Sequence, residues 1–228
     1  DTLKVQNLNE VIVKGVRATK EAPYAVANIK KSELQQFSST GKELPFLLSR
    51  TPGILAWGEN GIGTGTTYMR IRGAAGSRIN VTVDGVPLNS PEDQCVFWAN
   101  MNSYAALMGS AQIQRGIGSS TNGDGAFGGA VSLATAAPSL KPTVEVTGSY
   151  GSFNTYRFGG KFSTGLLWDH LVLDGAYHET NTDGYIHGTS GRSGSYYGGL
   201  TWFGDRFKIS YKNIGNFEHT GQAWNGVP

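Results

Sequence analysis

Histidine and cysteine side chains are the first candidates for chemistry, but their spacing in this chain supports no reaction. The sequence contains 4 histidines and 1 cysteine. The histidines are too scattered for a metal-binding constellation: His170, His178, His187 and His219. Cys95 has no second cysteine with which to form a disulfide or a metal cage. Since no nucleophile and base pair is recognisable either, the sequence predicts a protein that is not an enzyme and holds no metal or cofactor.

Charged residues next to glycine have a more informative spacing, because each follows a short β-prone stretch. Tyr68 to Gly73 runs into an Arg-Gly pair, and Ile79 to Leu88 contains an Asp-Gly pair. A third pair is Arg115-Gly116. Such pairs favour tight turns between strands. The pattern therefore indicates a folded strand and turn framework in which charges lie at strand ends.

The stretch from Gln112 to Thr135 is the element around which this framework is organised. It predicts a strand, a glycine-rich reversal and a second strand. Four glycines surround Phe127, which we expect to be the anchor of the reversal: Gly123, Gly125, Gly128 and Gly129. A phosphate-binding loop is the alternative, but no Gly-Lys-Ser/Thr follows and the residues after Gly129 alternate like a strand.

Five short motifs occur in a fixed order along this part of the chain: Pro52-Gly53-Ile54, Ile71-Arg72-Gly73, Asp84-Gly85-Val86-Pro87, Arg115-Gly116 and Gly123 to Gly129. Each motif is weak alone, but the ordered set resembles the plug domain of TonB-dependent outer-membrane receptors. The resemblance assigns these residues to the plug motif: Arg70, Arg72, Gly73, Asp84, Gly85, Arg115, Gly116, Gly125, Phe127, Gly128 and Gly129. It also implies that Arg70, Arg72 and Arg115 belong to a charged cluster on the plug or at its barrel contact, with a plain surface role as the alternative.

One departure from the family pattern concerns the segment after Arg115-Gly116. Many members have Pro and Tyr where this chain has Ile117 and Asn122. The variant is similar to receptors of the Bacteroidetes type, so cargo cannot be inferred from enterobacterial members.

Composition agrees with a β-rich outer-membrane protein. The 228 residues include 33 glycines, with 39% hydrophobic and 16% charged residues and a net charge of +2. The sequence has no basic stripe with interleaved aromatic residues, so it gives no indication of nucleic-acid binding. No apolar run approaches the roughly 18 residues that a membrane helix needs, so a protein of this kind in a membrane is expected to be a barrel.

Residues 1–21 are expected to form an extended segment that binds TonB, an interpretation that the resemblance supplies. Its TonB box is assigned to a β-prone run: Glu10, Val11, Ile12 and Val13. TonB would add a strand to this run through main-chain pairing. Asp1 to Val5 is a second candidate, and an ordinary first plug strand is the alternative for either.

Residues 22–137 are expected to form the plug, an α+β domain with a small mixed sheet. Short helices are predicted at Ser32 to Phe37 and at Lys42 to Ser49. Trp57 to Thr67 and Leu88 to Asn100 are predicted as long loops. In the resembled receptors such loops touch the cargo, which makes these residues candidates: Trp57, Asn60, Asn89, Glu92, Asp93, Gln94, Phe97 and Trp98. For the last two, packing of the plug against the barrel wall is an equal alternative.

In residues 138–228, apolar and polar side chains alternate within stretches of roughly ten residues, which is typical of antiparallel transmembrane β-strands. About five strands are expected, with apolar faces toward outer-membrane lipid and faces carrying Arg157 or Lys161 toward the plug or water. Turns at 167–169 and 204–205 suit the periplasm, and 181–194 suits an extracellular loop. A barrel of this family has about 22 strands, so we expect a second polypeptide to supply the rest.

The resemblance implies active transport of a scarce nutrient across the cell outer membrane, driven through TonB and its inner-membrane energising complex. A ferric siderophore is the leading cargo, with cobalamin, haem, a glycan or a peptide as alternatives. A surface lipoprotein is a possible further partner. A cargo-sensing signalling receptor is the rival function, and it usually carries an additional periplasmic domain ahead of the box.

Overall fold

The structure, a computed structural model, describes residues 17–18, 24–117, 126–221 and 223. Both candidate TonB-box segments, together with Gly123, Gly125 and Asn122, lie outside the described residues. Within the described part, no helix is long and apolar enough to span a membrane.

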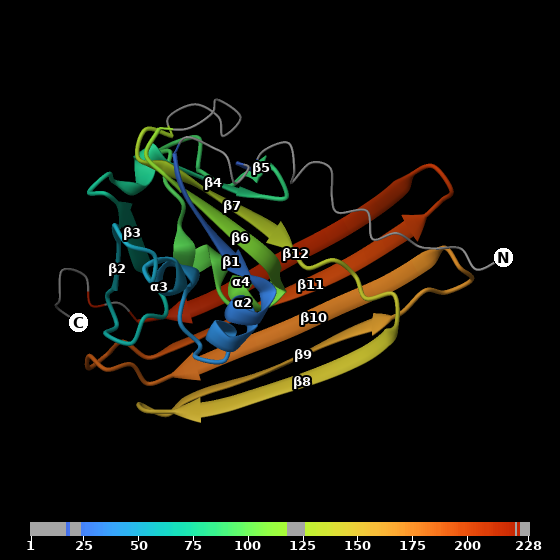
Figure 1. The fold of residues 1–228 in the computed structure, drawn as a ribbon. Helices are drawn as coiled ribbons and strands as arrows, with labels where there is room; N and C mark the ends of the chain where they lie inside the picture. The colour runs from blue at the N-terminus through green and yellow to red at the C-terminus, as the bar shows by residue number, and fades with distance from the viewer. Residues whose placement is uncertain (1–16, 19–23, 118–125, 222, 224–228) are drawn as a thin grey trace.

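The first half of the chain builds a five-stranded mixed sheet in the order β1-β6-β7-β4-β5 (Figure 1). Its strands are β1 (Ala25–Lys30), β4 (Ile79–Val83), β5 (Val86–Pro87), β6 (Met108–Arg115) and β7 (Gly129–Thr135). The β4 and β7 pair is parallel, and the other pairs are antiparallel. The mixed sheet and the two strands around the glycine-rich run confirm the prediction.

Short helices cover the sheet: α2 (Lys31–Ser38), α3 (Leu44–Leu48), α4 (Tyr104–Leu107) and the 3-10 turns η1 (Gly76–Arg78) and η2 (Trp98–Met101). The two helices predicted from the sequence are confirmed. Glu33 accepts a hydrogen bond from the backbone N–H of Lys30 at 3.3 Å, which caps the first turn of α2. Leu34 and Leu48 are fully buried and belong to the same hydrophobic core cluster as Ile113 and Leu133 of the sheet.

A separate hairpin joins β2 (Ile54–Gly58) to β3 (Thr67–Ile71). The prediction of one continuous loop from Trp57 to Thr67 is therefore wrong at both ends. Trp57 lies opposite Tyr68 in the register, and the two rings stack with centroids 5.3 Å apart. This aromatic cross-strand pair extends the strands into the glycine-rich segment. The second predicted loop also shortens, because η2 begins at Trp98.

The second half of the chain forms an antiparallel sheet in the order β12-β11-β10-β9-β8, which we call the wall. Its strands are β8 (Pro142–Gly151), β9 (Thr155–Thr164), β10 (Leu171–Thr182), β11 (Gly191–Phe203) and β12 (Lys208–Thr220). Large apolar side chains such as Val146, Phe158 and Tyr211 are exposed on its outer face. The inner face carries polar residues such as Arg157 and Lys212 toward the first sheet, as the alternation predicted.

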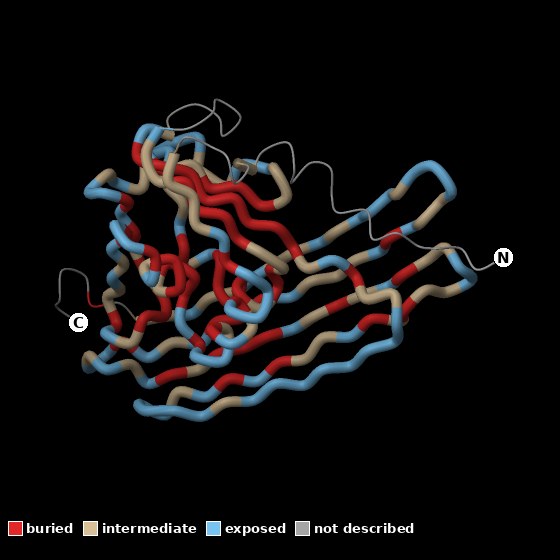
Figure 2. The backbone as a smooth tube through the Cα atoms, in the orientation of Figure 1, coloured by how far each residue is buried: buried red, intermediate tan, exposed pale blue. Residues whose placement is uncertain are grey.

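Figure 2 shows that burial is concentrated in the first sheet and its helices, whereas β8 is exposed along most of its length. Helices α2 and α4 lie between the first sheet and the wall (Figure 1). We call the end of the wall where the chain enters β8 at Pro142 the entry end, and the opposite end the far end.

Candidate functional site at the interface with the wall

Asp84 is positioned by a two-residue turn between β4 and β5. Asp84 and Gly85 both have positive φ, 50° and 84°, and Val83 pairs with Val86 on either side of them. Two central residues with positive φ define the type I′ hairpin turn, which Asp-Gly favours. The turn therefore holds the Asp84 carboxylate at the end of the sheet, beside the last residue of β7.

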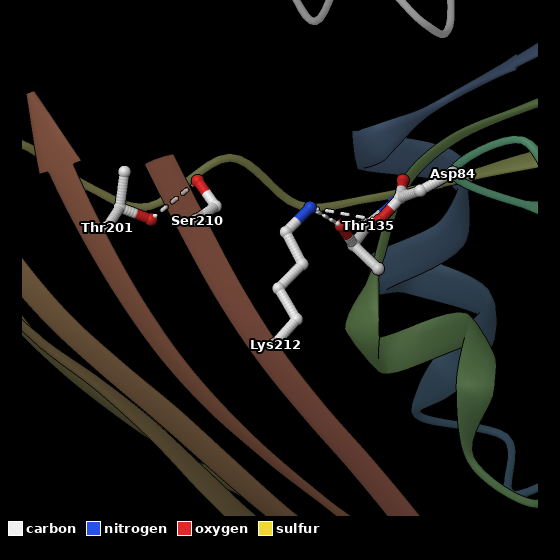
Figure 3. Close-up of polar contacts among 5 residues, drawn as sticks. All are labelled: Asp84, Thr135, Thr201, Ser210 and Lys212. Atoms are coloured by element: carbon white, nitrogen blue, oxygen red, sulfur yellow. Dashed lines mark hydrogen bonds and ion pairs between the residues drawn. The ribbon is translucent and has the colours of Figure 1, made fainter. Parts of the chain in front are cut away.

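The carboxylate of Asp84 is the centre of a three-residue contact that crosses to the wall (Figure 3). Its Oδ1 accepts from the Thr135 backbone N–H at 2.9 Å, and its Oδ2 accepts from the Thr135 hydroxyl at 2.7 Å. Lys212 Nζ of β12 donates to Asp84 Oδ2 at 2.9 Å and to Thr135 Oγ1 at 2.6 Å. We call Asp84, Thr135 and Lys212 the latch.

The latch is an ionised pair in a partly buried place. The side chains of Lys212 and Asp84 are 18% and 22% exposed. Burial alone would raise the pKa of Asp84, but the hydrogen bonds from Thr135 and Lys212 outweigh it and lower that pKa below its ordinary value. Charge-assisted hydrogen bonds of this kind contribute about 1.5–3 kcal/mol each. The latch therefore fixes the first sheet to β12 near the entry end.

Arg17 adds a contact that the sequence reasoning missed. Its guanidinium donates to Ser110 Oγ at 2.8 Å and to the Ser132 carbonyl at 2.9 Å, bridging β6 and β7. Gln112 holds the next residue, since its Oε1 accepts from the Ala18 N–H at 2.8 Å. Burial lowers the pKa of Arg17, and the Asp84 charge opposes that shift. The N-terminal segment is thus attached to the sheet at residues 17–18.

Toward the far end, the loop between β2 and β3 contacts the wall loop between β10 and β11. The Asn60 carbonyl accepts from the Tyr185 backbone N–H at 3.1 Å. The Asn60 side chain points inward, where Oδ1 accepts from the N–H groups of Ile62 and Gly63 at 3.1 Å each. Asn60 therefore shapes this loop and links it to the wall.

Three of the residues predicted to contact cargo make contacts within the plug: Asn60, Trp98 and Asn89. Asn60 and Trp98 are only 3% and 4% exposed. Trp98 belongs to the hydrophobic core cluster. Asn89 ties down the loop after β5, because it accepts from the Val81 N–H at 2.9 Å and donates to the Ile79 carbonyl at 2.9 Å.

The other predicted cargo residues lie at the surface. Phe97 and Trp57 are 57% and 38% exposed, and Glu92, Asp93 and Gln94 are exposed in the loop before Phe97. Asp93 Oδ1 accepts from the Cys95 N–H at 3.0 Å, which stabilises that loop. Phe97 follows that loop, whereas Trp57 belongs to the β2 and β3 hairpin.

The three arginines of the plug motif occupy two places. Arg72 and Gly73 form a second positive-φ turn, with φ of 50° and 82°. Arg115 Nη1 donates to the Pro52 carbonyl at 2.8 Å. Arg70 instead lies over the Trp57 ring, with its guanidinium carbon 5.7 Å from the centroid. Arg72 and Arg115 are thus brought near each other at the ends of β3 and β6, and Arg70 is on the hairpin.

Gly128 and Gly129, where the described part of the glycine-rich run enters β7, leave no room for a side chain. A Cβ at Gly128 would lie 2.4 Å from Ala74 Cβ, and one at Gly129 would lie 2.4 Å from the Gln114 carbonyl oxygen. The expectation that Phe127 anchors the reversal is wrong, because its side chain is 70% exposed. Close approach of other atoms to this backbone therefore requires glycine at both positions.

Comparison with known families gives this arrangement an identity. The family model for the TonB-dependent receptor plug domain matches residues 18–130. The chain carries a TonB-dependent receptor plug domain. This places the protein in the outer membrane, with the first sheet and its helices as the plug and the wall as barrel strands.

Solved structures share this combination of plug and wall. The siderophore receptor PirA from Acinetobacter baumannii is 20% identical, with a TM-score of 0.64, over 87% of this chain and 32% of its own. The receptor FpvA from P. aeruginosa bound to pyoverdine is 18% identical, with a TM-score of 0.70, over 89% and 26%. The alcaligin receptor FauA from Bordetella pertussis is 17% identical, with a TM-score of 0.69, over 90% and 34%. The chain spans about a third or less of the length of these receptors, and at this identity they share its fold.

A buried charge cluster lies between the plug and the wall and was not predicted. Glu43, at the start of α3, is 1% exposed, and Arg157 of β9 is 6% exposed. Burial raises the pKa of Glu43 well above its ordinary value, the Glu218 charge of β12 adds to that shift, and Arg157 opposes it. The sequence assigned Arg157 to the inner face of the wall, but nothing near Glu43 indicated that a carboxyl would be buried there.

Proposed function

We propose that this receptor actively imports a nutrient across the outer membrane and draws the energy for import from TonB. The plug fixed by the latch to the polar inner face of a wall, whose outer face is apolar, is the observation that carries the proposal. A plug held in this way obstructs passage along the wall, so cargo can pass only if the plug moves. Moving it requires work, which an outer membrane without a nucleotide pool must receive from a partner.

A ferric siderophore is the proposed cargo. The support is that PirA is described as a siderophore receptor and that FpvA is described with bound pyoverdine. Cobalamin, haem, a glycan or a peptide are the alternatives. Of the candidate contact residues, we propose the exposed ones as cargo contacts: Trp57, Glu92, Asp93, Gln94 and Phe97.

TonB is the proposed partner, and Glu10, Val11, Ile12 and Val13 are its proposed binding segment. An extended β-prone run can add a strand to a partner sheet through main-chain hydrogen bonds. Arg17 supports this assignment, since it attaches the chain to β6 and β7 only four residues after Val13. A pull on the box would then reach the plug sheet directly.

Growth and uptake measurements test the proposal. A strain lacking the receptor should fail to grow on a ferric siderophore as the sole iron source and should accumulate no radioactive iron from it. Ile12→Pro should abolish uptake while cargo still binds to cells, because proline removes a backbone donor from the pairing segment. Leu3→Pro is the matched control, and loss of uptake in that variant alone would move the box to Asp1 to Val5.

A signalling receptor would give a different result. Cargo would induce expression of target genes, and loss of the receptor would leave iron accumulation unchanged. That outcome would reject import and retain the receptor assignment.

A further inference from the structure

A cavity of about 390 Å³ separates the plug helices α2 and α4 from strands β8 to β10 of the wall. Gln35 and Ala106 line it on the plug side. Glu145, Lys161 and Asp174 line it on the wall side. It has room for on the order of ten water molecules, at about 30 Å³ each.

A second cavity of about 60 Å³ continues the first toward the far end. It shares Gln35, Ala106, Glu145 and Lys161 with the larger cavity. Along β8 the two together extend from Thr143 to Ser149. We call this continuous space the seam.

The lining of the seam suits water and polar solutes. Lys161 and Glu145 form an ion pair at 2.9 Å, and their side chains are 29% and 48% exposed, so both remain hydrated. Asp174 and Lys31 add one charge of each sign. A polar, charged space of this size is expected to hold ordered water rather than to stay dry.

Few direct contacts close the seam at its far end. Ser149 Oγ donates to the Ser39 carbonyl at 2.9 Å, which joins β8 to the segment after α2. Arg157 and His178 line the smaller cavity beneath that contact. The latch, by contrast, involves β12, which lies at the opposite edge of the wall from β8.

We propose that the plug separates from the wall along the seam, and that polar cargo moves through the widened seam while the latch still holds the plug to β12. The separation widens a space that is already polar, breaks the hydrogen bond from Ser149 to Ser39 and moves Arg157 of β9 away from the Glu43 charge. Movement on the β12 side would have to break the paired charges of the latch. This inference rests on the proposed import function.

Thiol labelling during transport tests the proposal. Ala106→Cys, in a Cys95→Ser background, places a thiol on the plug side of the seam. Thr201→Cys in the same background is the control, because Thr201 is 2% exposed on β11 near Lys212 (Figure 3). Cells are exposed to a bulky maleimide with and without TonB, with radioactive iron supplied as a ferric siderophore.

Labelling of Ala106→Cys should rise at least threefold when TonB and the siderophore are both present, and labelling of Thr201→Cys should not change. Once labelled, Ala106→Cys cells should still bind the siderophore but lose most of their uptake. Uptake without a rise at Ala106→Cys, or with an equal rise at Thr201→Cys, would overturn the seam and leave import standing. Absence of uptake in unlabelled wild-type cells would reject import itself.

Discussion

The latch and the seam are two regions of one interface, and they hold the plug to the wall in opposite ways. At the latch, Lys212 reaches from β12 to Asp84 and Thr135, and every polar atom of the Asp84 carboxylate is used. At the seam, Glu145 pairs with Lys161 on the wall itself, and a cavity separates that pair from the plug. Hydrogen-bonded ions therefore join plug and wall at β12, whereas at β8 to β10 a cavity lies between them beside the Ser149 to Ser39 bond and the Glu43 and Arg157 charges. The difference indicates which side can open.

The largest expected effect comes from breaking the plug sheet, on which both regions depend. Gly128→Val should destabilise the plug by about 3 kcal/mol or more, because even a Cβ there meets Ala74 Cβ at 2.4 Å and the Arg78 carbonyl oxygen at 3.0 Å. Thermal unfolding of the purified receptor measures the loss. Phe127→Leu is the control and should have little effect, since that side chain is 70% exposed. Equal melting temperatures for the two variants would remove the role assigned to Gly128.

The next effect compares the ion pairs of the two regions. Lys212→Met should destabilise the plug by about 2–3 kcal/mol, because it leaves the partly buried Asp84 carboxylate without its cation. Lys161→Met should cost less than about 1 kcal/mol, because the Glu145 carboxylate is 48% exposed and water replaces its partner. Urea unfolding of both variants gives the difference. Similar losses would mean that latch and seam are not distinct.

Asp84 and Glu43 should make the stability of the fold depend on pH in opposite directions. The pKa of Asp84 is lowered in the folded protein, so the stability it contributes is fully present above about pH 4 and is lost as the pH falls through the folded pKa. The pKa of Glu43 is raised, so it weakens the fold as the pH rises above about 4.5, where the unfolded carboxyl ionises.

Glu43→Gln should therefore stabilise the receptor at pH 7.5 and have almost no effect at pH 4.5. Unfolding of wild type and variant at the two pH values measures this. A variant that is less stable than wild type at pH 7.5 would show that the ionised carboxylate is well paired, with Arg157 as its partner.

The smallest expected effect is at the far end of the seam. Ser149→Ala removes one hydrogen bond to the Ser39 carbonyl and should cost about 0.5 kcal/mol. Hydrogen exchange of the amides at the end of α2 should become faster. Thr201→Val is the control, since its bond to Ser210 at 3.1 Å lies within the wall (Figure 3). Unchanged exchange in α2 would show that Ser149 does not restrain the plug.

Local chemistry explains which features could be predicted from the sequence. The Asp84-Gly85 turn, the strands around the glycine-rich run and the alternation of the wall each depend on neighbouring residues or on a period of two. These features were correct in the structure. Trp57 was expected in a loop but lies in β2, because its stacking on Tyr68 across the hairpin outweighs the glycine-rich composition of the segment.

The contacts of the site depend on pairing over long distances in the chain. Asp84 and Lys212 are 128 residues apart, and Arg17 reaches residues 93 and 115 positions away. A lysine on a polar strand face gives no local sign of which carboxylate it will meet. Glu43 was missed for the same reason, since its burial follows from β9 and β12 packing over the start of α3.

Cross-linking the plug to the wall, either at the latch or across the seam, tests the central claim most directly. Asp84→Cys with Lys212→Cys, and separately Gln35→Cys with Lys161→Cys, would be joined in Cys95→Ser cells by a flexible bifunctional thiol reagent. Uptake of iron from a ferric siderophore is then measured, with surface binding as the control. The account predicts that uptake continues when the latch is covalent and stops when the seam is joined, with binding intact in both. Uptake that stops at the joined latch and continues across the joined seam would contradict it.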